Sequence, residues 1–327
     1  MKTKMITRML LMGLAAVGLL YGQASAVEFN LVAGTTTVNL PGIGDVTMWG
    51  FGLEGGPITV PGPALTVPPG ESLRINLTNN LPGDNPVSLM ILGQAMPTDG
   101  ESASPQVVRN PDGRIRSFVH ETANGESGVY EWANIKPGTY LYQSATHPAV
   151  QVQMGLYGGL INNAGENEAY AGVTYDDSTL LIYSEIDPAL HAAVENETYG
   201  TEAYPSTIDY APKYFLINGV PYTEGLDNFR TFEVGEKVLV RFVNAGLQTH
   251  MPVLMGMDLS LVAEDGNLYP YSKIQYSVPL PAGKTVDALV TPAVAGQFPI
   301  VDRALSLTNG GSQPGGMLTY LKVDPAD

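Results

Sequence analysis

Short runs of alternating or continuous apolar residues recur along the chain, and each run ends at turn-forming residues. Clear examples are SLRINLTN (72–79), KVLVRFVN (237–244) and DLSLVAEDG (258–266). Such runs are typical of β-strands. The chain also contains 37 glycines and 25 prolines, which leave most segments too short for helices. The pattern predicts an all-β protein built as a sandwich or a barrel.

One segment has a helical pattern instead. In DPALHAAVEN (187–196), Asp187 can cap the helix, Pro188 takes the first helical position and alanines follow. We expect a short helix here, with His191 on its surface.

Two parts of the chain repeat each other. TVPPGESLRINLTN (66–79) aligns with TFEVGEKVLVRFVN (231–244), so that Thr, Gly-Glu and the final Asn coincide. KPGTYLYQS (136–144) is similarly related to VAGQFPIVD (294–302). Two elements repeated in the same order predict two similar β domains in tandem. We expect domain 1 over 27–165, domain 2 over 213–327, and a linker with the short helix over 166–212.

The N-terminus has the pattern of a secretory signal peptide. A basic start is followed by twelve apolar residues (9–20) and then by the small residues of Ala24-Ser25-Ala26. The apolar run is too short to span a bilayer, which takes roughly 20 residues. We therefore expect residues 1–26 to be removed. The mature protein is expected in the periplasm or outside the cell, without a membrane span.

The composition narrows the range of partners. The formal net charge is −16, and a field of that sign repels nucleic acid and favours cationic partners. The chain has no cysteine, so neither a disulfide nor a thiolate ligand is available to it. No nucleic-acid partner is expected.

Five segments carry a family resemblance: MWGFG (48–52), PGPALTVPPGESLRINLTNNLP (61–82), KPGTYLYQSATHPAVQVQMGLYGGLI (136–161), FLINGVPY (215–222) and the strands within 240–266. In this order they resemble the first two cupredoxin (plastocyanin-like) domains of multicopper oxidases. The resemblance covers nearly the whole mature chain. It implies two tandem Greek-key β-sandwich domains.

The resemblance also implies where copper ligands would stand. The family's first His-x-His motif falls on SLMILGQ, where Met90 and Leu92 occupy the histidine positions. The second motif falls on YQSA, where Gln143 and Ala145 do so. A trinuclear copper cluster takes about eight imidazole nitrogens, and a blue-copper site takes a thiolate and two imidazoles. With four histidines and no cysteine, the chain is expected to carry no catalytic copper set and no cofactor.

A displaced soft-metal site is the alternative, because thioether and imidazole groups suit Cu(I). His147 follows the second motif and could join His120 and Met154. The opposing interpretation is a loop histidine held by hydrogen bonds, with Gln143 and Gln153 forming a polar network where copper would sit.

The segment HMPVLMGM (250–257) offers a second version of this alternative. Met255 and Met257 would point the same way from a strand, close in sequence to His250. Methionines also commonly fill hydrophobic cores, so these residues equally fit a core strand.

Two functions therefore remain open. The first is a non-enzymatic binding or scaffold protein of the cell envelope, with another protein or copies of itself as partner. The second is a copper-binding oxidoreductase or copper-handling protein that uses the displaced His/Met site.

Overall fold

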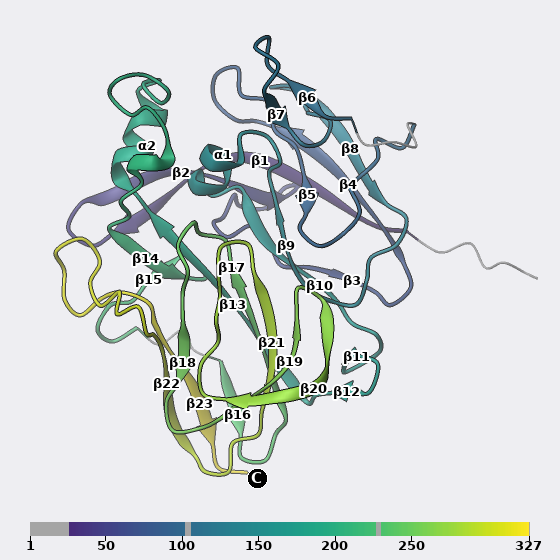
Figure 1. Ribbon diagram of the computed structural model, residues 1–327, viewed down its shortest axis with the longest axis vertical. Coiled ribbons are helices and arrows are strands. Elements are labelled where there is room, and N and C mark those ends of the chain that lie inside the picture. Colours follow the sequence, from purple (N-terminus) through teal and green to yellow (C-terminus); the bar gives the residue numbers. More distant parts are fainter. Residues whose placement is uncertain (1–25, 102–105, 227–229, 327) are drawn as a thin grey trace, which may run out of the picture.

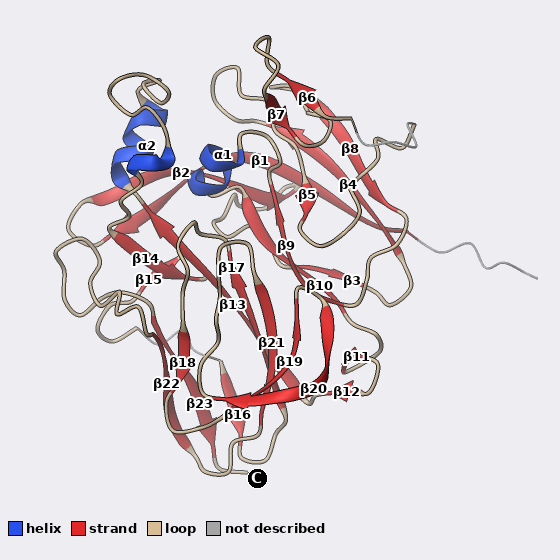
Figure 2. Cartoon of the chain, in the orientation of Figure 1, coloured by secondary structure: helices blue, strands red, loops and turns tan. Residues whose placement is uncertain are grey.

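The computed structural model describes residues 26–101, 106–226 and 230–326. The predicted signal peptide lies, apart from its last residue, outside this part of the chain. Strands dominate, and the described residues contain two short α-helices (Figure 2). Figure 1 shows the N-terminal half above the C-terminal half, with both helices in the upper half. No helix among the described residues is long and apolar enough to cross a membrane.

Domain 1 is a sandwich of two four-stranded sheets with the orders β2-β1-β4-β8 and β3-β10-β9-β5. In β4, every second residue is buried, as the alternating sequence predicts. These inward side chains, among them Leu73, Ile75 and Leu77, form the domain 1 core. The strand bounds are β1 Ala26–Leu40, β2 Gly44–Leu53, β3 Leu65–Val67, β4 Ser72–Asn79, β5 Met90–Ile91, β8 Ser127–Trp132, β9 Gly138–Gln143 and β10 Tyr157–Asn162. A separate two-stranded ribbon joins β6 Val108–Arg109 and β7 Ile115–Ser117.

Domain 2 packs a seven-stranded sheet, β15-β14-β13-β17-β21-β19-β20, with a four-stranded sheet, β16-β23-β22-β18. The central strand β17 is buried along its whole length, which explains its nearly continuous apolar sequence. The bounds are β13 Asp177–Ile186, β14 Tyr214–Ile217, β15 Val220–Pro221, β16 Thr231–Glu233, β17 Val238–Asn244, β18 Pro252–Leu254, β19 Leu259–Glu264, β20 Asn267–Gln275, β21 Thr285–Val290, β22 Gly296–Asp302 and β23 Leu318–Asp324.

The predicted repeat has a structural counterpart. β3 and β4 correspond to β16 and β17, and the turn between each pair contains a glycine at positive φ, Gly70 at 76° and Gly235 at 90°. β4 pairs in parallel with β1, and β17 pairs in parallel with β13. The all-β fold with two tandem sandwich domains is thereby confirmed.

The segment expected to be a linker, 166–212, contains more structure than a linker. It includes a small hairpin, β11 Glu168–Tyr170 and β12 Val173–Thr174, and then β13, an inner strand of the domain 2 sheet. β13 pairs with β17 from Asp177 to Tyr183, so the domain 2 sheet begins near Asp177 rather than at residue 213. The expected helix is present as α2 Pro188–Glu195, and the Asp187 side chain caps it through the backbone N–H of Ala189 at 2.9 Å. A single 3₁₀ turn follows at Thr207–Asp209.

A buried polar contact joins the two domains. The Arg241 guanidinium on β17 donates to Thr139 Oγ1 on β9 at 2.9 Å and to Asn163 Oδ1 at 2.8 Å. Thr139 in turn donates to Asp287 on β21 at 2.6 Å. Next to this contact, side chains from both domains, including Leu141, form a continuous apolar cluster. The domains therefore share an interface that combines buried hydrogen bonds with a buried apolar cluster.

Candidate functional site

The four positions that the resemblance assigns to copper ligands lie on and beside strands β5 and β9 of domain 1. Met90 on β5 and Gln143 on β9 stand opposite each other in the sheet. Leu92 packs into the interdomain apolar cluster, and Ala145 is fully buried in the domain 1 core. These side chains offer a thioether, an amide and two hydrocarbon groups. That set does not fit the imidazoles of a copper cluster.

A set of neutral polar side chains lies beside these positions, and we call it the hydroxyl network. Ser88 Oγ lies 2.9 Å from Thr146 Oγ1 and 3.2 Å from Ser117 Oγ, and Ser144 donates to Gln151 Oε1 at 2.6 Å. All five residues are buried, and their remaining polar groups have partners outside the set: Thr146 donates to Glu121 Oε1 at 3.1 Å, and Gln151 Nε2 donates to the Pro86 carbonyl at 2.8 Å. The network uses Gln151 rather than the expected Gln143 and Gln153.

His120 and Met154 do not form a site with His147. The His120 ring stacks on Tyr130 with 4.3 Å between centroids, and its Nε2 donates to the Val129 carbonyl at 2.7 Å. Met154 lies at the end of helix α1 (Pro148–Met154) and is buried in the domain 1 core. Packing and hydrogen bonding within domain 1 account for the positions of both side chains.

His191 was expected on the surface of its helix, and this expectation is wrong. Only 4% of the residue is exposed, because α2 packs this face against β2 and α1. Its ring nitrogens lie 3.2 Å from the Thr47 carbonyl and 3.1 Å from the Gln153 carbonyl. Burial lowers the pKa of His191 and so favours the neutral ring. The residue ties α2 to domain 1.

His250 is buried between two acidic side chains, which we call the carboxylate–imidazole cluster. Its Nε2 lies 2.5 Å from Glu185 Oε1, and its Nδ1 lies 3.1 Å from Asp302 Oδ2. Burial by itself would lower the pKa of His250. The hydrogen bonds to Asp302 and Glu185 outweigh burial and raise the pKa to about 9. At neutral pH the ring is therefore an imidazolium that donates from both nitrogens.

Other donors occupy the remaining oxygen positions of this cluster. Glu185 accepts from the backbone N–H groups of Leu247 and Gln248, each at 3.1 Å. Asp302 accepts from the N–H groups of Met251 and Ala304, at 2.8 and 3.1 Å. The cluster thus fastens loop 245–251 to strands β13 and β22. Among the described residues, no group of three or more His, Asp or Glu side chains is arranged to hold a metal ion.

His147 differs from the other three histidines. It caps the N-terminus of α1 with a left-handed backbone, φ 40° and ψ 55°, and its side chain makes no capping hydrogen bond. Partial burial and, secondarily, the nearby Arg116 charge lower its pKa. His147 lines a cavity of about 390 Å³, which we call the His147 cavity.

The methionines of 250–257 line a second cavity, of about 660 Å³. Met251, Met255 and Met257 contribute to its wall together with Asp258 and Arg303. His250 does not line it, so the predicted His/Met combination is not brought together. Met257 also packs against the domain 2 core, while Met255 is 47% exposed. We call this the methionine cavity.

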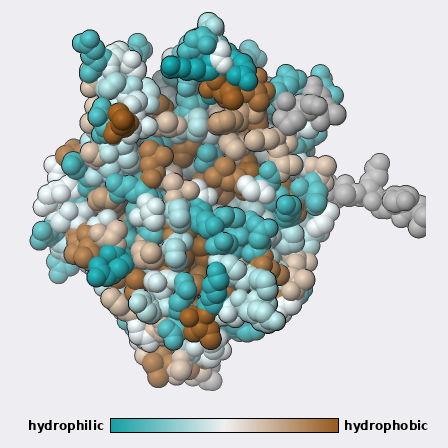
Figure 3. Space-filling view, viewed as in Figure 1, coloured by the Kyte–Doolittle hydropathy of each residue, from teal (hydrophilic) through white to brown (hydrophobic). Residues whose placement is uncertain are grey.

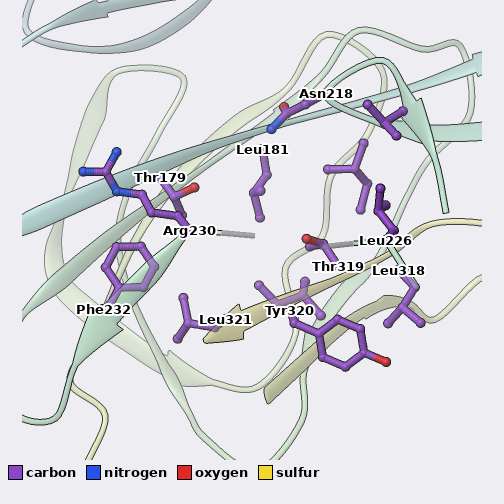
Figure 4. A pocket seen from close by; sticks show the side chains of 13 residues that line it. Thr179, Leu181, Asn218, Leu226, Arg230, Phe232, Leu318, Thr319, Tyr320 and Leu321 are labelled. Carbon is purple, nitrogen blue, oxygen red and sulfur yellow. The ribbon is translucent and has the colours of Figure 1, made fainter. Parts of the chain in front are cut away.

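A third cavity, of about 100 Å³, opens between the two sheets of domain 2 (Figure 4). Figure 4 shows mainly apolar side chains around it, including Leu181 and Leu321, with the Arg230 guanidinium at one side. Arg230 is already paired with Asp177 at 2.5 Å. Among the described residues of its wall, this small cavity therefore offers a ligand no charged group without a partner.

Sequence spacing gave no sign of the carboxylate–imidazole cluster or of the His147 cavity. Glu185, His250 and Asp302 come from three distant strands and loops. The cavity joins Trp49 on β2, the turn at 83–85 and the chain after α2. Only the tertiary fold brings these residues together.

The fold defines a two-domain protein of the cupredoxin class. The chain belongs to the multicopper oxidase family, which matches residues 56–166 and 177–324.

Curated relatives carry copper-related names. A Copper resistance protein A homolog of Pseudomonas syringae pv. tomato is 24% identical over 92% of this chain and 54% of its own length. Multicopper oxidase MmcO of Mycobacterium tuberculosis is 26% identical over 80% of this chain and 55% of its own. The chain spans about half the length of the curated relatives it matches.

Solved structures agree on the fold. The blue copper oxidase of Nitrosomonas europaea superposes with a TM-score of 0.73 at 20% identity, covering 91% of this chain and 86% of that one. The copper nitrite reductase of the same organism gives 0.66 at 20% identity, covering 92% and 94%. At this level of identity the likeness establishes architecture alone.

Proposed function

We propose that this chain is a multicopper-oxidase-like protein that has lost the family's His-x-His ligands and acts as a non-enzymatic binding or scaffold protein of the cell envelope. The carrying observation is the donor set at positions 90, 92, 143 and 145, where no imidazole is present. The family's chemistry depends on several imidazoles converging on copper, and hydrocarbon side chains cannot replace them.

The four existing histidines support this proposal. The His250 ring donates from both nitrogens to carboxylates, and His191 lies between two carbonyl oxygens. His120 donates one nitrogen to a carbonyl and stacks on a tyrosine. A nitrogen that donates a proton has no lone pair for a metal, which excludes both His250 nitrogens and His120 Nε2, while the neutral His191 ring is buried against two carbonyl oxygens. Only His147 lines a cavity with its ring free of hydrogen bonds to described residues.

A binding role is supported by strand β20, which lies at the edge of the seven-stranded sheet. Tyr271, Ile274 and Tyr276 on or beside it are 87, 75 and 63% exposed. Figure 3 shows hydrophobic side chains in separate patches on this face, one of them toward the lower end of domain 2. An edge strand with unpaired backbone groups and exposed apolar side chains suits strand addition by a partner or by a second copy.

The cellular location belongs to the same proposal. The basic start, the apolar run and the small residues before Val27 suit export to the periplasm or beyond. Mass spectrometry of the N-terminus of protein recovered from an envelope fraction tests it. A mature start near Val27 supports export, and an intact Met1 in the cytoplasm contradicts it.

Metal content and oxidase activity test the absence of copper chemistry. Protein purified from the exported fraction is incubated with Cu(II), desalted, and assayed for bound copper and for oxidation of a laccase-type phenol. We expect less than one tightly held copper per chain and no turnover above free Cu(II). Stoichiometric copper with turnover would overturn the proposal.

Light scattering tests the binding surface. If β20 mediates contact between copies, Ile274→Lys lowers the oligomer mass. Ile208→Lys, at a residue that is 86% exposed outside this surface, leaves the mass unchanged. If the wild type is monomeric, envelope pull-downs with the same two variants ask whether a partner is lost from Ile274→Lys alone. Identical behaviour of both variants in both assays contradicts a role for β20.

A second candidate function is copper handling, favoured by one observation. Met251, Met255 and Met257 line the same cavity with Asp258, and thioethers suit Cu(I). Anaerobic competition with a chromophoric Cu(I) chelator tests it. Tight binding that is abolished by Met255→Leu with Met257→Leu supports copper handling. Binding that is absent or insensitive to these changes excludes this cavity.

A further inference from the structure

The His147 cavity has the size and walls of a small-molecule site. It lies between the turn at 83–85, the first turn of α1 and the chain after α2, and its volume is about 390 Å³. Ligand pockets in proteins typically measure about 300–1,000 Å³ and combine apolar walls with a few polar groups. This cavity is therefore large enough for a compact organic ligand.

Two aromatic side chains form part of the wall. Trp49 is 5% exposed and so presents only a small part of its ring to the cavity. Tyr199 stands close to Tyr204, with 5.8 Å between ring centroids, which restricts its orientation. Aromatic faces attract cations through their quadrupole, and the attraction is strongest for tryptophan.

The charges around the cavity are predominantly negative. Asp84 and Glu197 line it, and no lysine or arginine is among the described residues of its wall. Arg116 lies close enough to influence His147, but its guanidinium is hydrogen-bonded to Glu121. His147 is held toward its neutral form, because burial and Arg116 lower its pKa. The net charge of −16 adds a long-range field that attracts cations.

We propose that the His147 cavity binds a small organic cation, an ammonium group on a compact apolar body. The aromatic walls and the two carboxylates would receive the ammonium group, and Val150 and Val194 would contact the apolar part. The His147 ring nitrogens, which have no hydrogen bond to a described residue, can hydrogen-bond a hydroxyl on the same ligand. This site does not depend on the absence of copper chemistry, so it stands or falls separately from the proposed function.

Paired probes test the charge requirement. Choline and its uncharged carbon analogue 3,3-dimethylbutan-1-ol have nearly the same shape, so their difference in affinity measures recognition of charge. The full chain is titrated with each by calorimetry, at low and at physiological salt. We expect choline to bind about tenfold more tightly than the alcohol at physiological salt, which is the scale of a partly desolvated cation–π contact. Equal affinities, or no binding of either probe, would overturn the proposal.

Variants locate the site. Asp84→Asn and Glu197→Gln each weaken choline binding several-fold and leave the affinity for the alcohol unchanged. Glu195→Gln is the matched control, because Glu195 is exposed on α2 without lining the cavity. Tryptophan fluorescence is a second readout, since Trp49 lines the cavity and Trp132, the other of the two tryptophans, does not. Loss of binding in Glu195→Gln equal to that in Glu197→Gln would show nonspecific charge attraction and contradict the site.

Discussion

The hydroxyl network in domain 1 and the carboxylate–imidazole cluster in domain 2 are both buried and polar, yet they differ in charge. The first joins serine, threonine and glutamine side chains beside the positions where the family places copper ligands. The second holds an imidazolium between two carboxylates. Neutral hydroxyls can satisfy each other at little cost, whereas buried charges must keep every partner.

This difference shows two ways in which the fold accommodates buried polar side chains. In domain 1 the positions that the resemblance assigns to ligands carry uncharged groups, and the Glu121 carboxylate that Thr146 contacts is paired with Arg116. In domain 2 the His250 ring donates to both Glu185 and Asp302, so these three side chains together fasten loop 245–251. The buried polar groups of both regions have hydrogen-bond partners. Changes in the charged cluster should therefore cost more stability, and depend more on pH, than changes in the neutral network.

The largest effect is expected for His250→Leu. This change leaves two carboxylates buried without their shared cation, and breaking a buried charge pair costs about 3–5 kcal/mol. Urea unfolding measures the loss. His147→Ala, at an exposed ring, is the control and should change stability by less than about 0.5 kcal/mol. Adding Glu185→Gln to His250→Leu should restore part of the stability, and equal losses for His250→Leu and His147→Ala would contradict a charged cluster.

The pH dependence of stability is the next test. The pKa of His250 is raised from 6.5 to about 9, so its contribution is complete below pH 6.5 and is lost as pH rises through 9. Between pH 6.5 and 9.5 the wild type should lose on the order of 3 kcal/mol of unfolding free energy through this group. His250→Leu should lack this component. A wild type and variant with parallel stability curves would show that His250 is not charged in the fold.

A smaller loss of folding stability is expected for Gly246→Ala. A Cβ at this position would collide with the Glu185 carboxylate, so the loop would have to move away from its anchor. Overpacking of this kind costs about 1–3 kcal/mol. Gly311→Ala is the matched control, because no atom lies within 4 Å of its added Cβ. Equal thermal stability of the two variants would contradict the close approach.

The smallest effect is expected for Ser88→Ala. It removes one member of the hydroxyl network and the acceptor for the Ala145 N–H at 3.2 Å, which should cost about 1–2 kcal/mol. Since no group of the network changes charge between pH 6.5 and 9.5, the cost should be the same at both. If the stability lost in Ser88→Ala changed with pH in the same way as that lost in His250→Leu, the two regions would not differ in charge.

The fold was largely readable from sequence because its signals are local. Alternation in β4, the repeat around Gly70 and Gly235, and the Asp187 cap each depend on neighbouring residues. The expected domain boundary at residue 213 left β13 outside domain 2. This strand lies between a hairpin and a helix in sequence, and only its pairing with β17 makes it an inner strand of the domain 2 sheet.

The candidate sites were only partly readable. The composition alone limits the imidazole and thiolate groups that could bind copper. The position of His147, directly after the second motif, marked it as a candidate site residue. The burial of His191 and the partners of His250 depend on contacts between segments more than fifty residues apart. Local pattern carries no information about such contacts.

One measurement tests the central claim most directly: copper bound per chain, together with oxidase turnover, in exported protein loaded with Cu(II) and then desalted. If the imidazole positions of the family are lost, copper stays well below one equivalent and phenol oxidation does not exceed the background from free Cu(II). Several firmly held coppers with sustained turnover would mean that this chain keeps the family's chemistry on ligands that the donor count excludes.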